Sequence, residues 1–287
     1  MRIKIINPNT TWSMTEKIGA CARAVARPGT EVIAVSPAMG PASIESHYDE
    51  ALAVPGLLQE IARGEAEGVD GYVIACFGDP GLKAARELAR GPVVGIAEAA
   101  MHLASMVGTR FSVVTTLGRT MGQAWHLAEI YGMERFCANV RACELPVLEL
   151  EVPGSSARER IIEECRRALA EDGCDAIVLG CAGMADLCEH IGRTLGVPVI
   201  DGVAAATTLV ESLVALRLAT SKHGELARPL PKAMAGALAG FTLGEAPAAA
   251  APSSVPALRR ASHPPAPPPR RSPESAACDR RRTRPPG

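Results

Sequence analysis

Two cysteines of this chain stand in near-identical surroundings. Cys76 lies in "GYVIACFGDPGL" and Cys181 in "AIVLGCAGMADL", and in each stretch an aliphatic run leads to the cysteine, with a glycine, Gly78 or Gly183, two positions later. A cysteine thiolate is a base as well as a nucleophile, and a protonated thiol can return a proton. If such groups lie on opposite faces of one carbon, the pair can invert that carbon by removing a proton from one face and delivering another to the opposite face.

The position of each cysteine also bears on its acidity. A thiol has a reference pKa near 8.5, and a helix N-terminus lowers it. Both cysteines precede a glycine turn and a helical pattern, so we expect lowered pKa values and one thiolate–thiol pair that exchanges roles. A single buried cysteine is more often a packing residue. Two at equivalent places in an internal repeat favour catalysis, and the other seven cysteines are interpreted as structural.

The elements that must position these cysteines alternate along the chain. Short runs rich in Val and Ile, bounded by turn residues, alternate with helical patterns such as "GLKAARELAR" and "ARERIIEECRRALAED", as in parallel β/α architectures. The predicted strands are "RIKIIN", "TEVIAVS", "GYVIACF", "PVVGIA", "RFSVVTT", "AIVLGCA" and "PVIDG". The order of these segments repeats, which predicts an α/β fold of two pseudo-symmetric halves, each a parallel sheet flanked by helices. Ligands of such sheets bind at the carboxyl ends of the strands, so we expect the active site in the cleft between the halves.

Four segments follow from this pattern. The first α/β half is predicted over 1–108 and the second over 109–222, with a helix near 202–220 packing back on the first half. Residues 223–243 form a connecting segment. Residues 244–287 are rich in Pro, Ala and Arg, which predicts a disordered tail because such a composition buries too little apolar surface to offset ordering. A reading-frame slip would produce a similar segment, and the sequence does not separate the two explanations.

Polar residues at other strand ends are candidates for the lining of the cleft. Asn9 lies in the turn "NPNT" after the first strand, and Thr115 and Thr116 end the fifth predicted strand. Their side chains offer donors and acceptors to a neutral polar ring, and the backbone N–H groups of the two glycines could stabilise an enolate oxygen. Asn9 could instead cap the following helix, or do both. Asp79, directly before Pro80, is predicted to cap the helix that follows it and is assigned no chemistry.

Composition narrows the class of protein. The chain has 287 residues, 47% of them hydrophobic and only 3% aromatic, and a net charge of −1. This charge gives no electrostatic footprint for nucleic acid or an anionic membrane. No apolar run reaches the roughly 18–20 residues of a membrane-spanning helix, and the N-terminus lacks the features of a signal peptide. We therefore expect a cytoplasmic protein that acts on a small molecule.

Neither the cysteines nor any sequence motif predicts a metal or a cofactor. The nine cysteines include no CxxC pair, so in a reducing compartment they are expected to be thiols. Cys174, Cys181 and Cys188 are evenly spaced but fall on different predicted elements, which disfavours a metal site. The sequence has no GxGxxG, Walker or HExxH motif and so no sign of a nucleotide or zinc cofactor. The six histidines form no cluster and none neighbours either cysteine.

Several stretches resemble a known family. The chain is similar to the aspartate/glutamate/hydantoin racemase superfamily, and within it to the hydantoin racemases, over residues 1–222; the matching stretches are "INPNT", "GPASIESHYDEALAVPGLL", "VIACFGDPGL", "PVVGIAEAA", "RFSVVTTL", "IVLGCAGMADL" and "PVIDGVAAA". The resemblance implies cofactor-independent racemisation by Cys76 and Cys181, substrate bound between pseudo-symmetric halves, and a homo-oligomer. It also implies that Ser43 and Ile44, in "SIESHYDE", shape the pocket beside the substituent of the substrate.

The residues after each cysteine indicate the kind of substrate. The amino-acid racemases of this superfamily resemble Cys-Asn-Thr and Cys-Thr-His at these two places, whereas here Phe77 and Ala182 follow the cysteines, each before its glycine. Apolar and backbone groups favour a neutral substrate, so we expect a 5-substituted hydantoin. Allantoin, itself a 5-substituted hydantoin, is the alternative substrate, and Phe77 weakly favours an apolar substituent. A non-catalytic binding protein and a dithiol redox sensor remain alternatives from other classes, although a disulfide requires Cα atoms within about 7 Å.

Overall fold

The structure, a computed structural model, describes residues 1–243, so the predicted tail over 244–287 lies outside the described residues. The described chain contains two parallel sheets of four strands, in the orders β2-β1-β3-β4 and β6-β5-β7-β8. Counted from the first strand of each sheet, both orders are second, first, third, fourth. The α/β fold of two equivalent halves that the sequence repeat predicts is confirmed. The domain limits within these residues stay a prediction.

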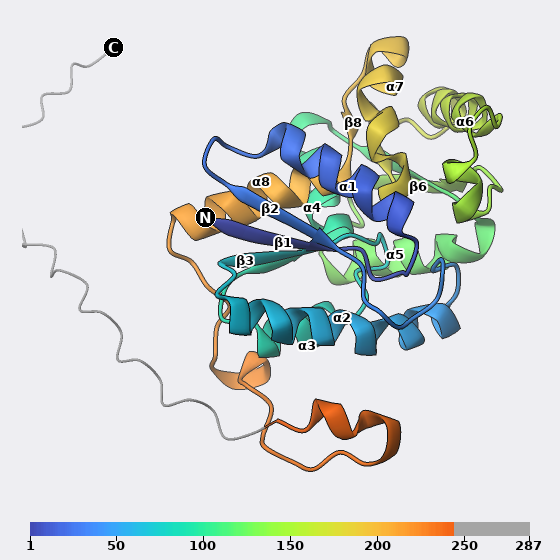
Figure 1. The fold of residues 1–287 in the computed structure, drawn as a ribbon. Coiled ribbons are helices and arrows are strands. Elements are labelled where there is room, and N and C mark those ends of the chain that lie inside the picture. The colour runs from blue at the N-terminus through green and yellow to red at the C-terminus, as the bar shows by residue number, and fades with distance from the viewer. Residues whose placement is uncertain (244–287) are drawn as a thin grey trace, which may run out of the picture. The chain divides into compact units, whose positions relative to one another are not determined.

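The first sheet and its helices occupy the N-terminal part of the chain (Figure 1). Its elements are β1 (Arg2–Ile6), α1 (Trp12–Val25), β2 (Glu31–Val35), α2 (His47–Glu67), β3 (Gly71–Ile74), α3 (Leu82–Leu88), β4 (Val93–Gly95) and α4 (Ile96–Val107). Helices α2 and α3 lie side by side. Leu57 of α2 and Leu82 of α3 are buried with Tyr72 and Ile74 of β3 in one hydrophobic cluster. This cluster anchors β3, the strand that leads to Cys76.

The second sheet repeats this plan. Its elements are β5 (Phe111–Thr115), η1 (Gly118–Thr120), α5 (Met121–Ile130), β6 (Cys137–Ala142), η2 (Val147–Glu151), α6 (Ala157–Glu171), β7 (Ala176–Leu179), η3 (Ala182–Leu187), α7 (Cys188–Leu195), β8 (Val199–Ile200) and α8 (Gly202–Ala215), where η denotes a 3₁₀ helix. The short η4 (Gly224–Leu226) and η5 (Gly236–Phe241) follow. Within residues 1–243, no helix combines the length and the apolarity that crossing a bilayer requires.

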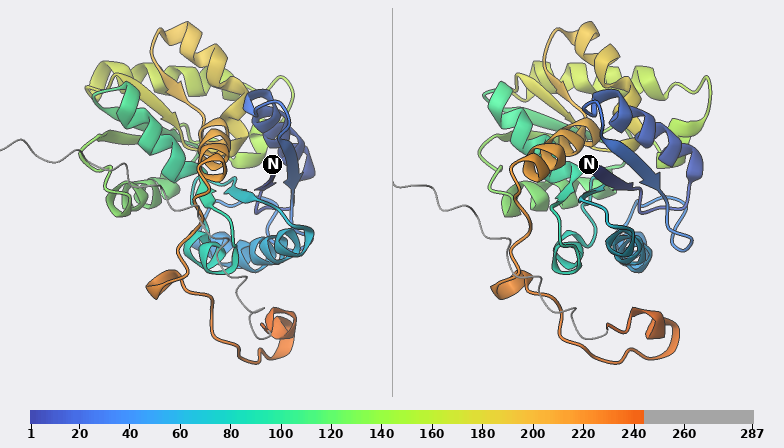
Figure 2. Two further views of the ribbon diagram at one scale, coloured as in Figure 1. Left: turned by 90° about the vertical axis from the view of Figure 1, so that its left-hand side faces the viewer. Right: turned by 60° about the vertical axis from the view of Figure 1, so that its left-hand side comes forward.

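One hydrophobic cluster joins the two halves. It contains Val73 of the first sheet and Val178 of the second, together with Ala104 of α4 and Ala206 of α8. The alanines let the helices approach closely, and α8 packs against α1, α4 and the first sheet (Figure 2). The fully buried carboxylate of Glu211 on α8 accepts a hydrogen bond from the backbone N–H of Arg27 at 2.9 Å, which ties α8 to the connection between α1 and β2. The two sheets therefore share one core, in addition to a hydrophobic cluster within each half.

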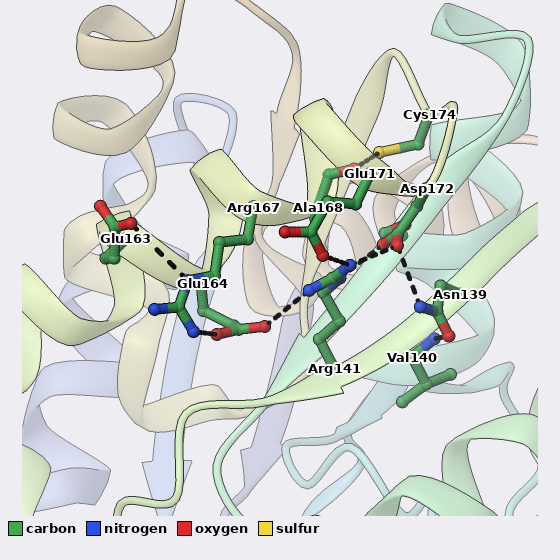
Figure 3. Close-up of polar contacts among 11 residues, drawn as sticks. Asn139, Val140, Arg141, Glu163, Glu164, Arg167, Ala168, Glu171, Asp172 and Cys174 are labelled. Atoms are coloured by element: carbon green, nitrogen blue, oxygen red, sulfur yellow. Dashed lines mark hydrogen bonds and ion pairs between the residues drawn. The ribbon is translucent and has the colours of Figure 1, made fainter.

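The edge strand β6 was not among the predicted strands. Its residues "CANVRA" place polar side chains at alternate positions, and these find partners on α6 and its C-cap. The guanidinium of Arg141 forms ion pairs with Asp172 at 2.6 Å and with Glu164 at 3.1 Å, and Asn139 donates to Asp172 at 3.0 Å (Figure 3). A strand held by ion pairs lacks the aliphatic run on which the sequence prediction depended.

Candidate active site

The turn that carries Cys76 begins two residues beyond β3. The backbone N–H of Asp79 donates to the carbonyl of Cys76 at 2.9 Å and closes this turn. Asp79 adopts a φ of +44°, in the left-handed region that non-glycine residues rarely occupy. The backbone N–H of Gly78 faces the Cys76 thiol and acts to lower its pKa. The turn thus points one backbone donor at the sulfur.

Cys181 occupies the equivalent place two residues beyond β7. It is the N-cap of η3, and the backbone N–H of Met184 donates to its carbonyl at 3.1 Å. The backbone N–H of Gly183 acts to lower the pKa of the Cys181 thiol, as the backbone N–H of Gly78 does for Cys76. The two cysteine turns are therefore alike in position, in the hydrogen bond that closes them and in the donor that faces the sulfur. This likeness is what the repeated sequence stretch predicts.

Both cysteines line one cavity between the carboxyl ends of the two sheets. The cavity also contains seven of the residues predicted to bind substrate, which are Asn9, Ile44, Phe77, Gly78, Thr115, Thr116 and Ala182. The other two predicted residues, Ser43 and Gly183, do not line it; Gly183 lines a neighbouring surface hollow instead. The cavity volume is about 50 Å³, which corresponds to a few waters at roughly 10–15 Å³ each. A ring-sized ligand thus needs an opening movement to enter.

The polar side chains of the cavity are held by one another. Asn7 donates from Nδ2 to Oδ1 of Asn9 and to Oγ1 of Thr15, both at 2.9 Å. Oδ1 of Asn9 also accepts from the backbone N–H of Thr11, directly before α1. The hydroxyl of Thr115 donates to the carbonyl of Gly180 at 3.2 Å. Asn9 therefore both supports the start of α1 and lines the cavity, as the two interpretations of this residue together suggested.

The described residues that line the cavity include no Asp, Glu, Lys, Arg or His. Burial is the largest influence on both thiols: it raises the pKa of Cys76 to about 12 and that of Cys181 to about 11. The sequence predicted lowered pKa values for both thiols, and this prediction is wrong because the net shift is upward. One backbone N–H at each sulfur does not compensate for the loss of solvent, because burial in an apolar environment disfavours the charged thiolate. Both groups are thiols at neutral pH in this structure.

Some lining residues escaped the sequence prediction. Met14 comes from α1, Val147 from η2, and Thr120, Gln123 and Ala124 from η1 and α5. They lie on elements beside the strand ends rather than at them, so the strand-end pattern contained no signal for them. Gln123 is placed tightly: a Cβ on Gly78 would lie 2.7 Å from its Nε2. A larger residue at position 78 would require the Gln123 side chain to move.

Two hydrogen bonds join the halves around the cavity. Gln123 of α5 donates from Nε2 to Oε2 of Glu50 on α2 at 2.6 Å. On the loop before α2, Oε1 of Glu45 accepts from the backbone N–H of Val147 at 2.6 Å. Burial raises the pKa of Glu50 above its ordinary value, while His47 acts in the opposite direction. Each contact thus links a residue of the cavity lining, Gln123 or Val147, to the first half.

Asp79 does cap a helix, but not the one that the sequence predicted. Its Oδ1 and Oδ2 accept from the backbone N–H groups of Ala97 at 3.1 Å and Glu98 at 2.9 Å, in the first turn of α4. The helix that follows it in sequence, α3, has Gly81 as its N-cap and no side-chain cap. The left-handed conformation of Asp79 turns its carboxylate away from α3 and towards α4.

Residues 1–243 contain no group of three or more His, Cys, Asp or Glu side chains arranged to hold a metal ion. Two of the evenly spaced cysteines make separate hydrogen bonds. Cys174 donates to the carbonyl of Ala168 at 3.4 Å and Cys188 to that of Val199 at 3.0 Å. Their sulfurs therefore serve local contacts in the second half.

Comparisons with known proteins agree with this geometry. The family model described as Asp/Glu/Hydantoin racemase matches residues 3–210. The hydantoin racemase of Pseudomonas sp. (strain NS671) is 50% identical over 241 residues, which are 84% of this chain and 97% of that protein. The hydantoin racemase of Rhizobium meliloti is 52% identical over 236 residues, 82% of this chain and 98% of its own.

Solved structures point the same way. The allantoin racemase from Klebsiella pneumoniae superposes with a TM-score of 0.83 at 60% identity, covering 84% of this chain and 99% of that one. The fold and these relatives define an isomerase of the racemase class. The chain belongs to the Asp/Glu/hydantoin racemase family.

Proposed function

We propose that this racemase interconverts the D and L forms of 5-monosubstituted hydantoins, with Cys76 and Cys181 as its two bases. The observation that carries the proposal is the pair of thiols on equivalent turns at one cavity whose lining residues carry no charged side chain. An uncharged lining suits a neutral cyclic ureide, because a buried amino-acid carboxylate or ammonium group would need a charged partner. The names of the hydantoin racemases that match the chain support the same substrate class.

In the proposed mechanism one cysteine acts as a thiolate and the other as a thiol. The thiolate removes the proton at C5 and becomes a thiol, and the electron pair of the broken C–H bond moves into the ring as an enolate. The thiol on the opposite face then gives its proton to C5 and becomes the thiolate. One proton is taken and one returned, so no cofactor is required. The ring delocalises the enolate, which makes C5–H acidic enough for a thiolate base.

Allantoin is the second candidate substrate. The similarity to the Klebsiella pneumoniae allantoin racemase, at 60% identity, favours it, and allantoin carries the same ring with a polar ureido substituent. Phe77 in the cavity lining favours an apolar substituent instead. The two candidates share the chemistry at C5 and differ only in the group attached there.

A proton-exchange assay tests the proposal. Each enantiomer of benzylhydantoin, and separately of allantoin, is incubated with the protein in deuterated buffer while optical rotation and loss of the C5 proton are followed. We expect the wild type to racemise with deuterium incorporation above the spontaneous rate, and Cys76→Ser and Cys181→Ser each to lose racemisation by at least about 10³-fold. Cys188→Ser, whose thiol lies outside the cavity lining, is the matched control. If neither substrate exchanges its C5 proton above the spontaneous rate, the proposal is wrong.

The same assay separates the remaining alternatives. Turnover of allantoin alone assigns that substrate. Saturable ligand binding without exchange favours a binding protein, and loss of both free thiols under mild oxidation favours a redox sensor. We also propose that the protein works as a homo-oligomer in the cytoplasm, and sedimentation velocity of the purified chain measures its oligomeric state. A protein that sediments as a monomer at all concentrations contradicts that part.

A further inference from the structure

The two halves differ at one place where their sequences align. Aligned from their prolines, "PVVGIAEAA" and "PVIDGVAAA" place Gly95 opposite Asp201. Asp201 is the N-cap of α8, and its carboxylate accepts from the backbone N–H groups of Val203 and Ala204, both at 2.9 Å. Gly95 precedes α4 and has no side chain to do the same. The first half must therefore cap its helix by another route.

Asp79 supplies the missing carboxylate. A Cβ on Gly95 would lie 2.2 Å from Cγ of Asp79, so the Asp79 side chain occupies the space that a local cap would fill. Its two oxygens accept from the first turn of α4, as those of Asp201 do on α8. Asp79 is only three residues beyond Cys76, whereas Asp201 lies on a different connection from the one that carries Cys181. Within residues 1–243, the turn that carries Cys76 thus supplies the side-chain cap of α4, whereas the cap of α8 comes from outside the turn that carries Cys181.

A third contact ties Asp79 to the other half. The hydroxyl of Tyr131, directly after α5, donates to Oδ2 of Asp79 at 2.7 Å. Asp79 is 5% exposed, so these hydrogen bonds form away from water, where they are strengthened. They also hold the residue in a left-handed backbone conformation that non-glycine residues rarely adopt. This strained backbone persists because the three acceptor contacts fix the carboxylate.

We propose that Asp79 is a positioning residue for Cys76: through α4 and Tyr131 it fixes the turn that sets the Cys76 thiol against one face of the substrate. The proposal rests on the proposed function of the cavity. Asp79 does not line the cavity itself, but Phe77 and Gly78, the two residues between it and the cysteine along the chain, both do. A shift of this turn moves the thiol and its backbone donor together.

A helix cap without any link to catalysis makes different predictions from a positioning residue. Loss of a plain cap lowers stability and leaves the two thiols equally affected. Loss of a positioning residue changes Cys76 and leaves Cys181 as it was. Asp201→Asn, which weakens the corresponding cap of α8, is the matched control. Tyr131→Phe removes only the hydroxyl that reaches across from the second half and leaves the capping contacts in place.

The test measures each thiol and the turnover separately. Asp79→Asn, Tyr131→Phe and Asp201→Asn are first compared by thermal unfolding, and then by iodoacetamide alkylation of Cys76 and Cys181 across pH, with the two peptides quantified by mass spectrometry. The charge of Asp79 acts to raise the pKa of Cys76, as do Cys181 and Glu50. Asp79→Asn should therefore shift Cys76 alkylation to lower pH, with Cys181 unchanged. Tyr131→Phe should alter the alkylation rate of Cys76 alone.

Turnover supplies the decisive comparison. We expect kcat to fall about tenfold or more in Asp79→Asn and Tyr131→Phe, with KM changed by less than about threefold, because a displaced reacting group loses transition-state rather than ground-state interactions. In Asp79→Asn, loss of the negative charge alone would make Cys76 easier to deprotonate. A fall in kcat in this variant is therefore not explained by the loss of charge. Asp201→Asn should retain the kcat of the wild type.

Three outcomes overturn the proposal: unchanged kcat in both Asp79→Asn and Tyr131→Phe, equal changes at the two thiols, or the same loss in Asp201→Asn. If Asp79→Asn does not fold, Tyr131→Phe decides the matter, because it removes a single oxygen. If the wild type racemises neither hydantoin nor allantoin, the proposed function fails, while the alkylation of the two thiols still shows whether Asp79 positions Cys76.

Discussion

Cys76 and Cys181 present the same difficulty for catalysis, because their partial burial favours the protonated thiol. Cys76 and Cys181 have pKa values raised to about 12 and about 11, mainly by loss of solvent. No charged side chain is among the described residues that line the cavity with them. The pKa is lowered by one backbone N–H at each sulfur and, for Cys181, by the charge of Lys17, but burial outweighs these effects. At neutral pH, only a small fraction of either cysteine is therefore present as the thiolate, and this fraction rises with pH.

The pH dependence of activity follows from this direction. Because the pKa of each thiol is raised, the thiolate is scarce at neutral pH and is lost further as the pH falls. We expect kcat/KM for hydantoin racemisation to rise between about pH 6 and pH 9 by roughly tenfold for each pH unit. Initial rates measured by polarimetry, corrected for spontaneous racemisation, check this. A plateau that begins near pH 7 would contradict raised thiol pKa values in the free enzyme.

At this scale the sequence predicted the main chemistry of the site but not its surroundings. The two cysteines and seven predicted neighbours meet at one cavity because each follows a strand or lies in a loop at that edge of the sheets. Gln123 and Met14 reach the cavity from helices, where side-chain direction depends on how the helix packs. The raised thiol pKa values depend on burial by residues distant in sequence, which no local pattern reports.

Among the elements, β6 depends most on polar contacts. Arg141 lies on this edge strand and meets Asp172 just after α6, and the side chains are 14% and 3% exposed. Burial acts to raise the pKa of Asp172, but the hydrogen bonds from Arg141, Asn139 and Ser112 outweigh it, so its pKa lies below the ordinary value. The folded state therefore gains stability from the ionised carboxylate, and this gain is lost as the pH falls through the lowered pKa.

Replacing Arg141 should destabilise the second half. Arg141→Met removes the ionic partner of the partly buried Asp172 carboxylate, and loss of such a charged hydrogen bond costs about 1.5–3 kcal/mol. Urea unfolding followed by circular dichroism measures the change in the free energy of unfolding. Arg166→Met, at an exposed helical ion pair, is the control and should cost less than about 1 kcal/mol. Equal effects of the two changes would show that the network contributes little.

The elements also show where local sequence patterns succeed. The predicted helices "GLKAARELAR" and "ARERIIEECRRALAED" correspond to α3 and α6, and all seven predicted strands are present. In these segments the aliphatic residues recur with the spacing that is typical of a helix or of a buried strand. Strand β6 lacks it, since its partners are charged groups on α6. The cap of α4 was missed because its carboxylate comes from Asp79, sixteen positions before Gly95 (95 minus 79), rather than from the preceding residue.

Across the whole molecule, all residues that line the cavity lie between positions 7 and 182, and the family model ends at residue 210. The hydrophobic cluster shared by the two sheets extends to Val210 on α8, with Leu213 and Val214 packed against it. Among residues 1–243, the cavity lining and this core therefore end with α8.

Removal of residues 244–287 should therefore leave the chemistry intact. We expect kcat and KM of the truncated chain to stay within about twofold of the full-length values, a difference of less than about 0.5 kcal/mol in activation free energy. Both proteins are compared in the same racemisation assay. Truncation before α8, at residue 200, is the contrasting control and should abolish folding, because it removes part of the shared core. A large loss of activity on removing 244–287 alone would assign the tail a role in function.

The hydrogen bonds that join the halves around the cavity also bear on how long a molecule remains inside. If the opening that a ring-sized ligand requires separates the halves, the contacts between Gln123 and Glu50, and between Val147 and Glu45, break each time a ligand passes. Racemisation is reversible, so a molecule retained for longer than one proton transfer inverts several times in a single visit. The released product is then an equal mixture of both enantiomers, whichever enantiomer was bound. Under that condition turnover follows the frequency of opening, and a more viscous solvent slows the enzyme without altering its chemical step.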